Sequence, residues 1–290
     1  MAKNIPAPLV SGYFHEPTWS IVYLVQDPAS NHAAVIDPVL DYDEKAGRVS
    51  TETADALLAE IGRRGLTIDW ILDTHPHADH FSAAAYLKDK LGAPTAIGAR
   101  VVEVQTLWRD IYNTPELRCD GSQWDRLFEA GDTLQVGSLR GRVMFSPGHT
   151  LASITYVFGD AAFVHDTLFQ PDYGTARADF PGGSAATLYD SITAILALPG
   201  DTRLFTGHDY RPGGREPRWE STVDEQRRCN PHLKGGVTRE AFVEAREARD
   251  RTLPMPKLIL HALQVNLRGG RLPDPEANGR SYLKIPIGAL

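Results

Sequence analysis

Short apolar runs and amphipathic segments alternate along the first third of the chain. Runs rich in β-branched and aromatic residues predict strands, and apolar residues at helical spacing predict helices. The predicted strands are Ser20–Gln26, Ala33–Asp37 and Trp70–Leu72, and the predicted helices are Thr51–Arg64 and Phe81–Leu91. This alternation is typical of a layered α/β protein.

The pattern then changes to short strands separated by glycine-containing turns. These predicted strands are Arg142–Phe145, Ser153–Phe158, Ala161–His165 and Arg203–Phe205, and the predicted helices are Ala185–Leu198 and Thr238–Arg251, with Thr238 as N-cap. Residues 216–228 are mostly polar, and the last forty residues are rich in Pro and Gly. We expect residues 1–235 to form a catalytic domain, and residues 236–290 to add a helix and an extended tail packed on it.

Composition narrows the function classes. The 290 residues carry a net charge of −7, which disfavours binding to nucleic acids or anionic membranes. Cys119 and Cys229 are the only cysteines, so a reducing compartment fits best. The N-terminus has no signal-peptide pattern and no apolar run approaches a membrane span, so a cytoplasmic protein is expected. The oligomeric state is not determined, and a homodimer stays open.

The strongest chemical signal is the segment Thr74–His80 (THPHADH), which follows a predicted strand. Four side chains that can bind a metal fall within six residues: His75, His77, Asp79 and His80. In an extended segment residues i and i+2 point the same way, so His75 and His77 can face one point. Imidazole and carboxylate together suit Zn, Fe or Mn. The alternative is a solvated histidine-rich turn. It is disfavoured because three histidines and an aspartate rarely fall within so short a span by chance.

Three further candidates stand where later predicted strands end: His149, Asp166 and His208. Such positions commonly carry the chemistry of α/β enzymes. Each residue alone is more often a buried polar residue than a ligand. Together with the first cluster, they favour a metal centre.

The whole set, HxHxDH followed by His, Asp and His, resembles the metallo-β-lactamase superfamily over residues 20 to 210. The resemblance implies an αβ/βα sandwich with the metal site at one edge. It implies that His75, His77, His149 and Asp166 line one metal position, and that Asp79, His80, Asp166 and His208 line a second. Asp166 would then bridge the two positions.

A narrower resemblance lies in Gly174–Gly183 (GTARADFPGG), which is similar to a signature of persulfide dioxygenases in the glyoxalase II-like branch. It implies one Fe(II) per chain, held by His75, His149 and Asp166, a two-histidine, one-carboxylate set. His77, Asp79, His80 and His208 would orient these ligands. The implied reaction converts glutathione persulfide and O2 into sulfite and glutathione.

The anionic substrate calls for a cationic anchor, and Arg177 is the best candidate, with a structural pair to Asp179 as an equal alternative. Tyr210 is a candidate for the same pocket. His165 replaces the glycine that many family members carry before the metal-binding aspartate. It is either a hydrogen-bond partner of the ligands or a buried histidine at a strand end. Cys119 and Cys229 are expected to be structural.

Other hypotheses for the function were weighed. A binuclear Zn hydrolase of the glyoxalase II type would use the full seven-residue set to cleave glutathione thioesters. Ligand spacing does not separate one iron from two zincs. A binding module that senses metal or binds none is disfavoured by the intact set of ligand types. A nuclease is disfavoured by the net charge of −7.

Overall fold

The computed structural model describes residues 7–289, which contain fifteen strands and seven α-helices. The strands are β1 (Leu9–His15), β2 (Ser20–Gln26), β3 (His32–Ile36), β4 (Val39–Asp43), β5 (Arg48–Ser50), β6 (Thr67–Leu72), β7 (Phe81–Ser82), β8 (Thr95–Gly98), β9 (Arg126–Phe128), β10 (Thr133–Val136), β11 (Leu139–Phe145), β12 (Ile154–Phe158), β13 (Ala161–His165), β14 (Arg203–Thr206) and β15 (Glu220–Thr222). The helices are α1 (Glu52–Arg63), α2 (Ala84–Leu91), α3 (Val101–Tyr112), α4 (Ala185–Leu196), α5 (Val223–Cys229), α6 (Arg239–Asp250) and α7 (Ile259–Asn266).

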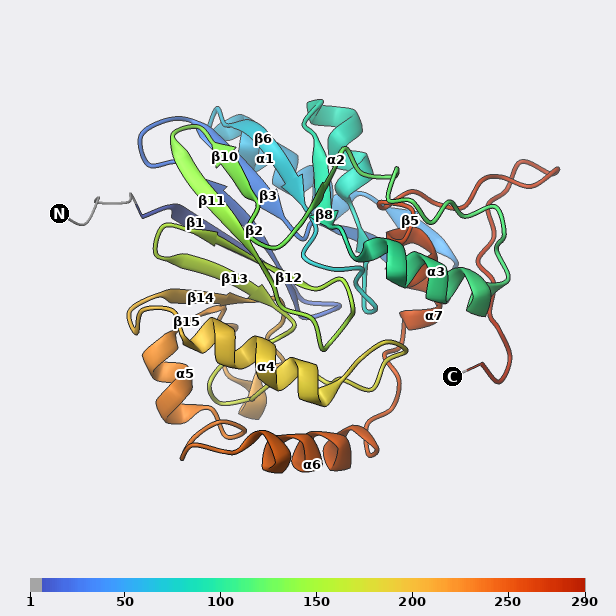
Figure 1. The fold of residues 1–290 in the computed structure, drawn as a ribbon. Coiled ribbons are helices and arrows are strands. Elements are labelled where there is room, and N and C mark those ends of the chain that lie inside the picture. Colours follow the sequence, from blue (N-terminus) through green and yellow to red (C-terminus); the bar gives the residue numbers. More distant parts are fainter. Residues whose placement is uncertain (1–6, 290) are drawn as a thin grey trace.

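Two six-stranded sheets pack face to face, and helices cover their outer faces (Figure 1). The first sheet has the order β1-β2-β3-β6-β8-β9 and the second the order β10-β11-β12-β13-β14-β15; β5, β4 and β7 form a small third sheet. Helices α1 and α2 lie on the first sheet; α4 lies on the second, and α6 packs against the outer side of α4 (Figure 1). The predicted α/β class and αβ/βα sandwich are confirmed.

Strand β2 shows how the sequence builds this layering, because both of its faces are buried. Ile21 and Tyr23 point into the core between the two sheets, whereas Val22 and Leu24 face the core beneath α1 and α2. Successive side chains of a strand point to opposite faces, so a continuous apolar run suits a strand covered on both sides.

The structure differs from the sequence-based prediction in several places. The segment expected to be helical from Phe81 begins with β7, and α2 starts only at Ala84. Residues 216–228 contain β15 and most of α5, and the expected extended tail contains α7. Helix α7 has only eight residues and follows the Pro-rich segment 254–256. Ala262 and Val265 stabilise it by packing into the core that α1 and α2 share with the first sheet, which a short window of sequence does not reveal.

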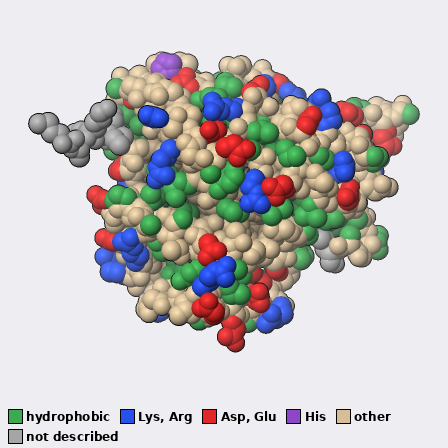
Figure 2. Space-filling model, viewed as in Figure 1, with side chains coloured by type: hydrophobic (Ala, Val, Ile, Leu, Met, Phe, Trp, Pro, Cys, Tyr) green, Lys and Arg blue, Asp and Glu red, His purple; other side chains and the backbone are tan. Residues whose placement is uncertain are grey.

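The α6 prediction was accurate, since Thr238 accepts a hydrogen bond from the backbone N–H of Ala241 as its N-cap. None of the helices formed by the described residues is both long and apolar enough to cross a membrane. Figure 2 shows one face of the molecule, on which acidic and basic side chains are interspersed among apolar ones.

A carboxylate joins the two sheets at the turn after β2. Asp27 accepts hydrogen bonds from the backbone N–H of Ala29 and the hydroxyl of Ser30 in its own turn. It also accepts bonds from the backbone N–H and hydroxyl of Ser138, in the turn between β10 and β11. Burial alone would raise the pKa of Asp27, but these hydrogen bonds outweigh it and lower the pKa to about 2.

We therefore expect Asp27→Asn to lower the free energy of unfolding by about 1–2 kcal/mol at pH 7, allowing for solvent screening near the surface. A carboxylate with a lowered pKa stabilises the fold above its unfolded-state pKa of 3.8, and this contribution disappears as the pH falls toward 2. Urea unfolding at pH 7 and pH 3 should show the difference between wild type and variant reduced by about half at pH 3. A difference that is absent at pH 7, or constant between the two pH values, would contradict this role of Asp27.

Candidate metal centre

Loops from both sheets meet at one edge of the sandwich. Strands β3 and β6 are parallel neighbours, as are β13 and β14, and adjacent parallel strands end on the same side of their sheet. Asp37 follows β3, the segment 73–80 follows β6, Asp166 follows β13 and His208 lies two residues beyond β14. This topology collects the candidate residues from four loops far apart in the sequence.

The fifth loop, which follows β11, brings in His149. Gly148 has φ +131°, and a Cβ at this position would lie 2.3 Å from the backbone nitrogen of Leu188 in α4. The Gly148 carbonyl accepts a hydrogen bond from the backbone N–H of Ser184, and the Pro147 carbonyl accepts one from the Ser191 hydroxyl. Helix α4 therefore holds the turn that presents His149, and only glycine allows so close an approach.

Three of the predicted ligands lie together. The ligand atoms of His75, His149 and Asp166 are within 4.8 Å of one another, and all three residues are buried. Nε2 of His149 lies 3.8 Å from Oδ2 of Asp166, which is too long for a hydrogen bond. Nε2 of His75 is buried with no hydrogen-bond partner among the described residues. An orphaned buried nitrogen is costly unless something binds it, so these atoms suit a metal ion.

Hydrogen bonds fix the ring nitrogen that each histidine offers. The Thr74 hydroxyl donates to Oδ2 of Asp37 at 2.8 Å, so it must accept the 3.0 Å bond from Nδ1 of His75. Nδ1 of His149 donates to the carbonyl oxygen of Arg177 at 2.9 Å. In both residues the proton sits on Nδ1, and Nε2 is left with its lone pair. This arrangement of outer partners is the one that metal-binding histidines usually have.

The protonation states of His75, His149 and Asp166 also suit a metal ion. Burial lowers the pKa of His75 well below 6.5 and also lowers that of His149, so both are neutral at pH 7. Burial would raise the pKa of Asp166, but the charge and hydrogen bond of His208 keep it below its usual value. The result is two neutral imidazoles and a carboxylate, the protonation states that metal binding requires.

The remaining predicted residues form a second cluster beside the first. His208 lies between two carboxylates, with Nδ1 2.5 Å from Oδ1 of Asp166 and Nε2 2.6 Å from Oδ2 of Asp79. Burial opposes protonation of His208, yet these carboxylates raise its pKa well above 6.5. Nδ1 of His80 bonds to the Phe81 carbonyl, which leaves Nε2 without a partner among the described residues.

His77 does not join His75, His149 and Asp166. Its Nε2 lies 3.0 Å from Oδ1 of Asp37, and its ligand atoms group with Asp79 and His80 or with Asp37 and Asp73. Burial lowers the pKa of His77, but Asp37 more than compensates and raises it to about 9. The expectation that His75 and His77 face the same point is therefore not what the structure shows.

Comparison with known proteins identifies the family. The model of the metallo-beta-lactamase superfamily matches residues 20–208, which include every candidate ligand described above. The chain belongs to the metallo-beta-lactamase superfamily. The resemblance inferred from the sequence is thus confirmed at superfamily level, and the His and Asp clusters are consistent with metal binding.

Relatives within the superfamily carry different names. A beta-lactamase hydrolase-like protein of Xylella fastidiosa is 67% identical over 99% of this chain, which spans 67% of that relative. Glyoxylase B2 of Dictyostelium discoideum is 45% identical, with 92% of each chain covered. The human mitochondrial persulfide dioxygenase ETHE1 is 32% identical over 91% of this chain and 90% of its own. The crystal structure of ETHE1 from Myxococcus xanthus superposes with a TM-score of 0.73 at 31% identity, covering 91% of this chain and all of that one.

The resemblance drawn from the sequence implies a glycine where this chain has His165. His165 has φ +41°, a left-handed conformation that favours glycine. Its Nε2 lies 3.0 Å from the hydroxyls of Ser146 and Thr167, and no hydrogen bond joins it to His75, His149 or Asp166. Of the two interpretations, the structure therefore matches the buried histidine at a strand end.

A cavity of about 770 Å³ opens beside the metal centre and is lined by Asp79, His149, Asp166, Arg177 and Tyr210 among others. Arg177 forms the structural pair considered as an alternative, with Nε 2.7 Å and Nη2 2.8 Å from the two oxygens of Asp179. Its Nη1 donates to the Pro254 carbonyl, so three of its five N–H groups are engaged. Tyr210 stacks on His208 with the rings 5.7 Å apart.

Sequence reasoning missed residues that support the ligands. Asp37 accepts bonds from the backbone N–H and hydroxyl of Thr74 and contacts His77, and it directly follows β3, as other predicted residues follow their strands. Asp73 accepts hydrogen bonds from Ser82 and from the indole N–H of Trp124. Burial raises the pKa of Asp73 to about 6, with a smaller contribution from Asp37. The position of Asp37 at the end of a predicted strand was a usable signal. Trp124, the partner of Asp73 that lies 51 residues away, left none.

Proposed function

We propose that this protein is a persulfide dioxygenase that converts glutathione persulfide, O2 and water into glutathione and sulfite, using one Fe(II) per chain held by His75, His149 and Asp166. The observation that carries the proposal is that these three residues present two Nε2 lone pairs and one carboxylate together. A two-histidine, one-carboxylate set leaves positions on iron open for substrate and O2. The similarity to persulfide dioxygenase ETHE1 over most of both chains supports it.

In this proposal iron, when bound, supplies the activation of O2 toward the terminal sulfur of the persulfide. The protein supplies orientation and a shaped cavity. Thr74 and the Arg177 carbonyl fix the imidazoles of His75 and His149. The two N–H groups of Arg177 that Asp179 and Pro254 do not use are available to a carboxylate of the substrate. Burial raises the pKa of Tyr210 well above 10, so its phenol stays protonated as a hydrogen-bond donor.

One observation favours the alternative, a binuclear zinc hydrolase of glutathione thioesters. The ligand atoms of Asp79, Asp166 and His208 also lie within 4.8 Å of one another, as a second metal would require. The 45% identity to glyoxylase B2 agrees with that alternative. Against it, both ring nitrogens of His208 are engaged with carboxylates, whereas those of His75 and His149 that face the cluster are free.

Elemental analysis of protein purified anaerobically, combined with O2 uptake on adding glutathione persulfide, distinguishes the two reactions. The proposal expects iron near one per chain, O2 consumption and release of sulfite. Zinc near two per chain, no O2 uptake and hydrolysis of a glutathione thioester would establish the hydrolase instead.

We expect Arg177→Ala to lower kcat/KM for a glutathione-derived substrate by about 10-fold, mainly through KM, because a charge-assisted anchor is lost. Arg100→Ala is the matched control: Arg100 makes an equivalent two-bond pair with Glu103 on α3 but does not line the cavity. Steady-state kinetics of both variants test this. Unchanged kinetics for Arg177→Ala would leave Arg177 as a purely structural partner of Asp179.

A further inference from the structure

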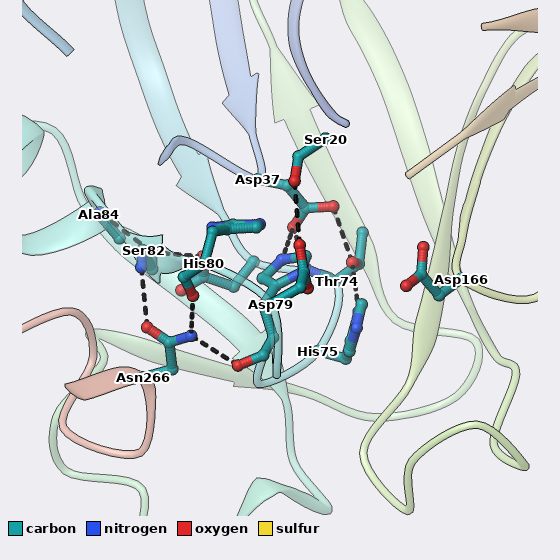
Figure 3. Close-up of polar contacts among 12 residues, drawn as sticks. Ser20, Asp37, Thr74, His75, Asp79, His80, Ser82, Ala84, Asp166 and Asn266 are labelled. Carbon is teal, nitrogen blue, oxygen red and sulfur yellow. Dashed lines mark hydrogen bonds and ion pairs between the residues drawn. The ribbon is translucent and has the colours of Figure 1, made fainter. Parts of the chain in front are cut away.

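Asn266, the last residue of α7, contacts the loop between β6 and β7, which carries His75, His77, Asp79 and His80. Nδ2 of Asn266 donates hydrogen bonds to the carbonyl oxygens of His77 and His80, each at 2.8 Å. Its Oδ1 accepts a hydrogen bond from the backbone N–H of Ser82, also at 2.8 Å. Figure 3 shows this side chain beside the loop, with bonds to three positions along it.

The orientation of this amide is fixed by its partners. Two carbonyl oxygens can only accept and a backbone N–H can only donate, so the NH2 group must face His77 and His80 and the oxygen must face Ser82. Asn266 is 3% exposed, so water does not compete for these bonds. One buried side chain thus fixes three points of a six-residue segment that includes Asp79 and His80.

Helix α7 is itself held firmly against this loop. Its apolar residues Ala262 and Val265 belong to the core beneath the first sheet. The carbonyl of Leu267 accepts a hydrogen bond from the buried side chain of Gln105 in α3. Gly270, at φ +85°, lies so close that an added Cβ would be 2.6 Å from the Ser82 carbonyl oxygen. Asn266 therefore acts from a rigid platform, which is what precise placement of ligands requires.

We propose that Asn266 is a positioning residue of the metal centre, and that its three hydrogen bonds set the backbone of residues 77–82 so that the metal-binding cluster is preorganised. The loop has no regular secondary structure between β6 and β7 to do this. The placement of Asp79 also affects Asp166, because His208 bonds to both carboxylates. The inference needs only that the cluster binds a metal, and it holds for either reaction discussed above.

The test compares two buried amides on the same helix. Gln264 is 2% exposed and also makes three hydrogen bonds, to the Leu260 carbonyl and to the backbone of Lys284 in the tail, away from the metal centre. Asn266→Leu and Gln264→Met each remove an amide of similar shape and burial. Co(II) is the probe, because its visible absorption reports ligand geometry and chelator competition gives its affinity.

We expect both variants to lower the thermal midpoint of the metal-stripped protein, and only Asn266→Leu to weaken Co(II) binding, by 10- to 100-fold, and to alter the Co(II) spectrum. Asn266→Asp, nearly the same size, should also weaken binding, since its second oxygen would face two carbonyls. If Asn266→Leu does not fold, Asn266→Asp alone decides the question. A folded Asn266 variant with wild-type Co(II) affinity and spectrum, or equal losses in Gln264→Met, overturns the proposal. Neither outcome bears on whether the persulfide reaction is the correct one.

Discussion

Replacing His149 by Ala, or Asp166 by Asn, will abolish stoichiometric metal binding and turnover. The first change removes, and the second neutralises, one of three ligand groups whose atoms lie within 4.8 Å of one another in a buried cluster. Loss of an outer partner of a metal ligand typically costs 10- to 100-fold in affinity, and loss of a ligand should exceed that range. Asp166→Asn keeps the shape of the side chain but removes the negative charge that would face the cation.

Metal content after purification and Co(II) affinity of the refilled protein measure this directly, and turnover follows from them. His32→Ala is a suitable control, because His32 bonds to Asp69 on the surface and belongs to neither cluster. It should retain metal and activity. Full metal content and turnover in both His149→Ala and Asp166→Asn would refute the proposed ligand set.

The candidate site could be inferred from the sequence because its metal-binding residue types occur in short, local sequence patterns. HxHxDH lies within six residues, and His149, Asp166 and His208 each stand where a predicted strand ends. Parallel pairing of β13 with β14 then places Asp166 near His208, although 42 residues separate them. Strand ends are recognisable in sequence, and topology brings them together.

The positions of supporting residues could not be inferred in the same way. His77 turns toward Asp37, 40 residues earlier, and so leaves the group formed by His75, His149 and Asp166. Asn266 bonds to a segment 184 to 189 residues away, and an asparagine at a helix end has no distinctive pattern. The pair of Arg177 and Asp179 was foreseeable from their spacing, whereas the bond to the Pro254 carbonyl depends on the tail.

The second large effect is expected at α6, where a buried ion pair holds the loop behind His149. Nη2 of Arg246 lies 2.5 Å from Oδ1 of Asp250, and the two side chains are 2% and 3% exposed. The other oxygen of Asp250 accepts the backbone N–H of Ala178, and Nη1 of Arg246 donates to the Thr175 carbonyl. These bonds flank Arg177, whose carbonyl oxygen fixes the ring of His149.

We expect Asp250→Ala to lower the free energy of unfolding by about 3–5 kcal/mol, because it leaves the Arg246 charge buried and unpaired. Asp190→Ala is the matched control, because Asp190 of α4 pairs with Arg239 of α6 at the surface. There the free energy of unfolding should fall by less than about 1 kcal/mol. Denaturant unfolding measures both. If residues 236–290 form one cooperative unit with residues 1–235, Asp250→Ala will shift a single transition and weaken metal binding through His149. A separate early transition, with the metal affinity unchanged, would show instead that α6 unfolds independently and that the loop carrying Arg177 keeps its position without it.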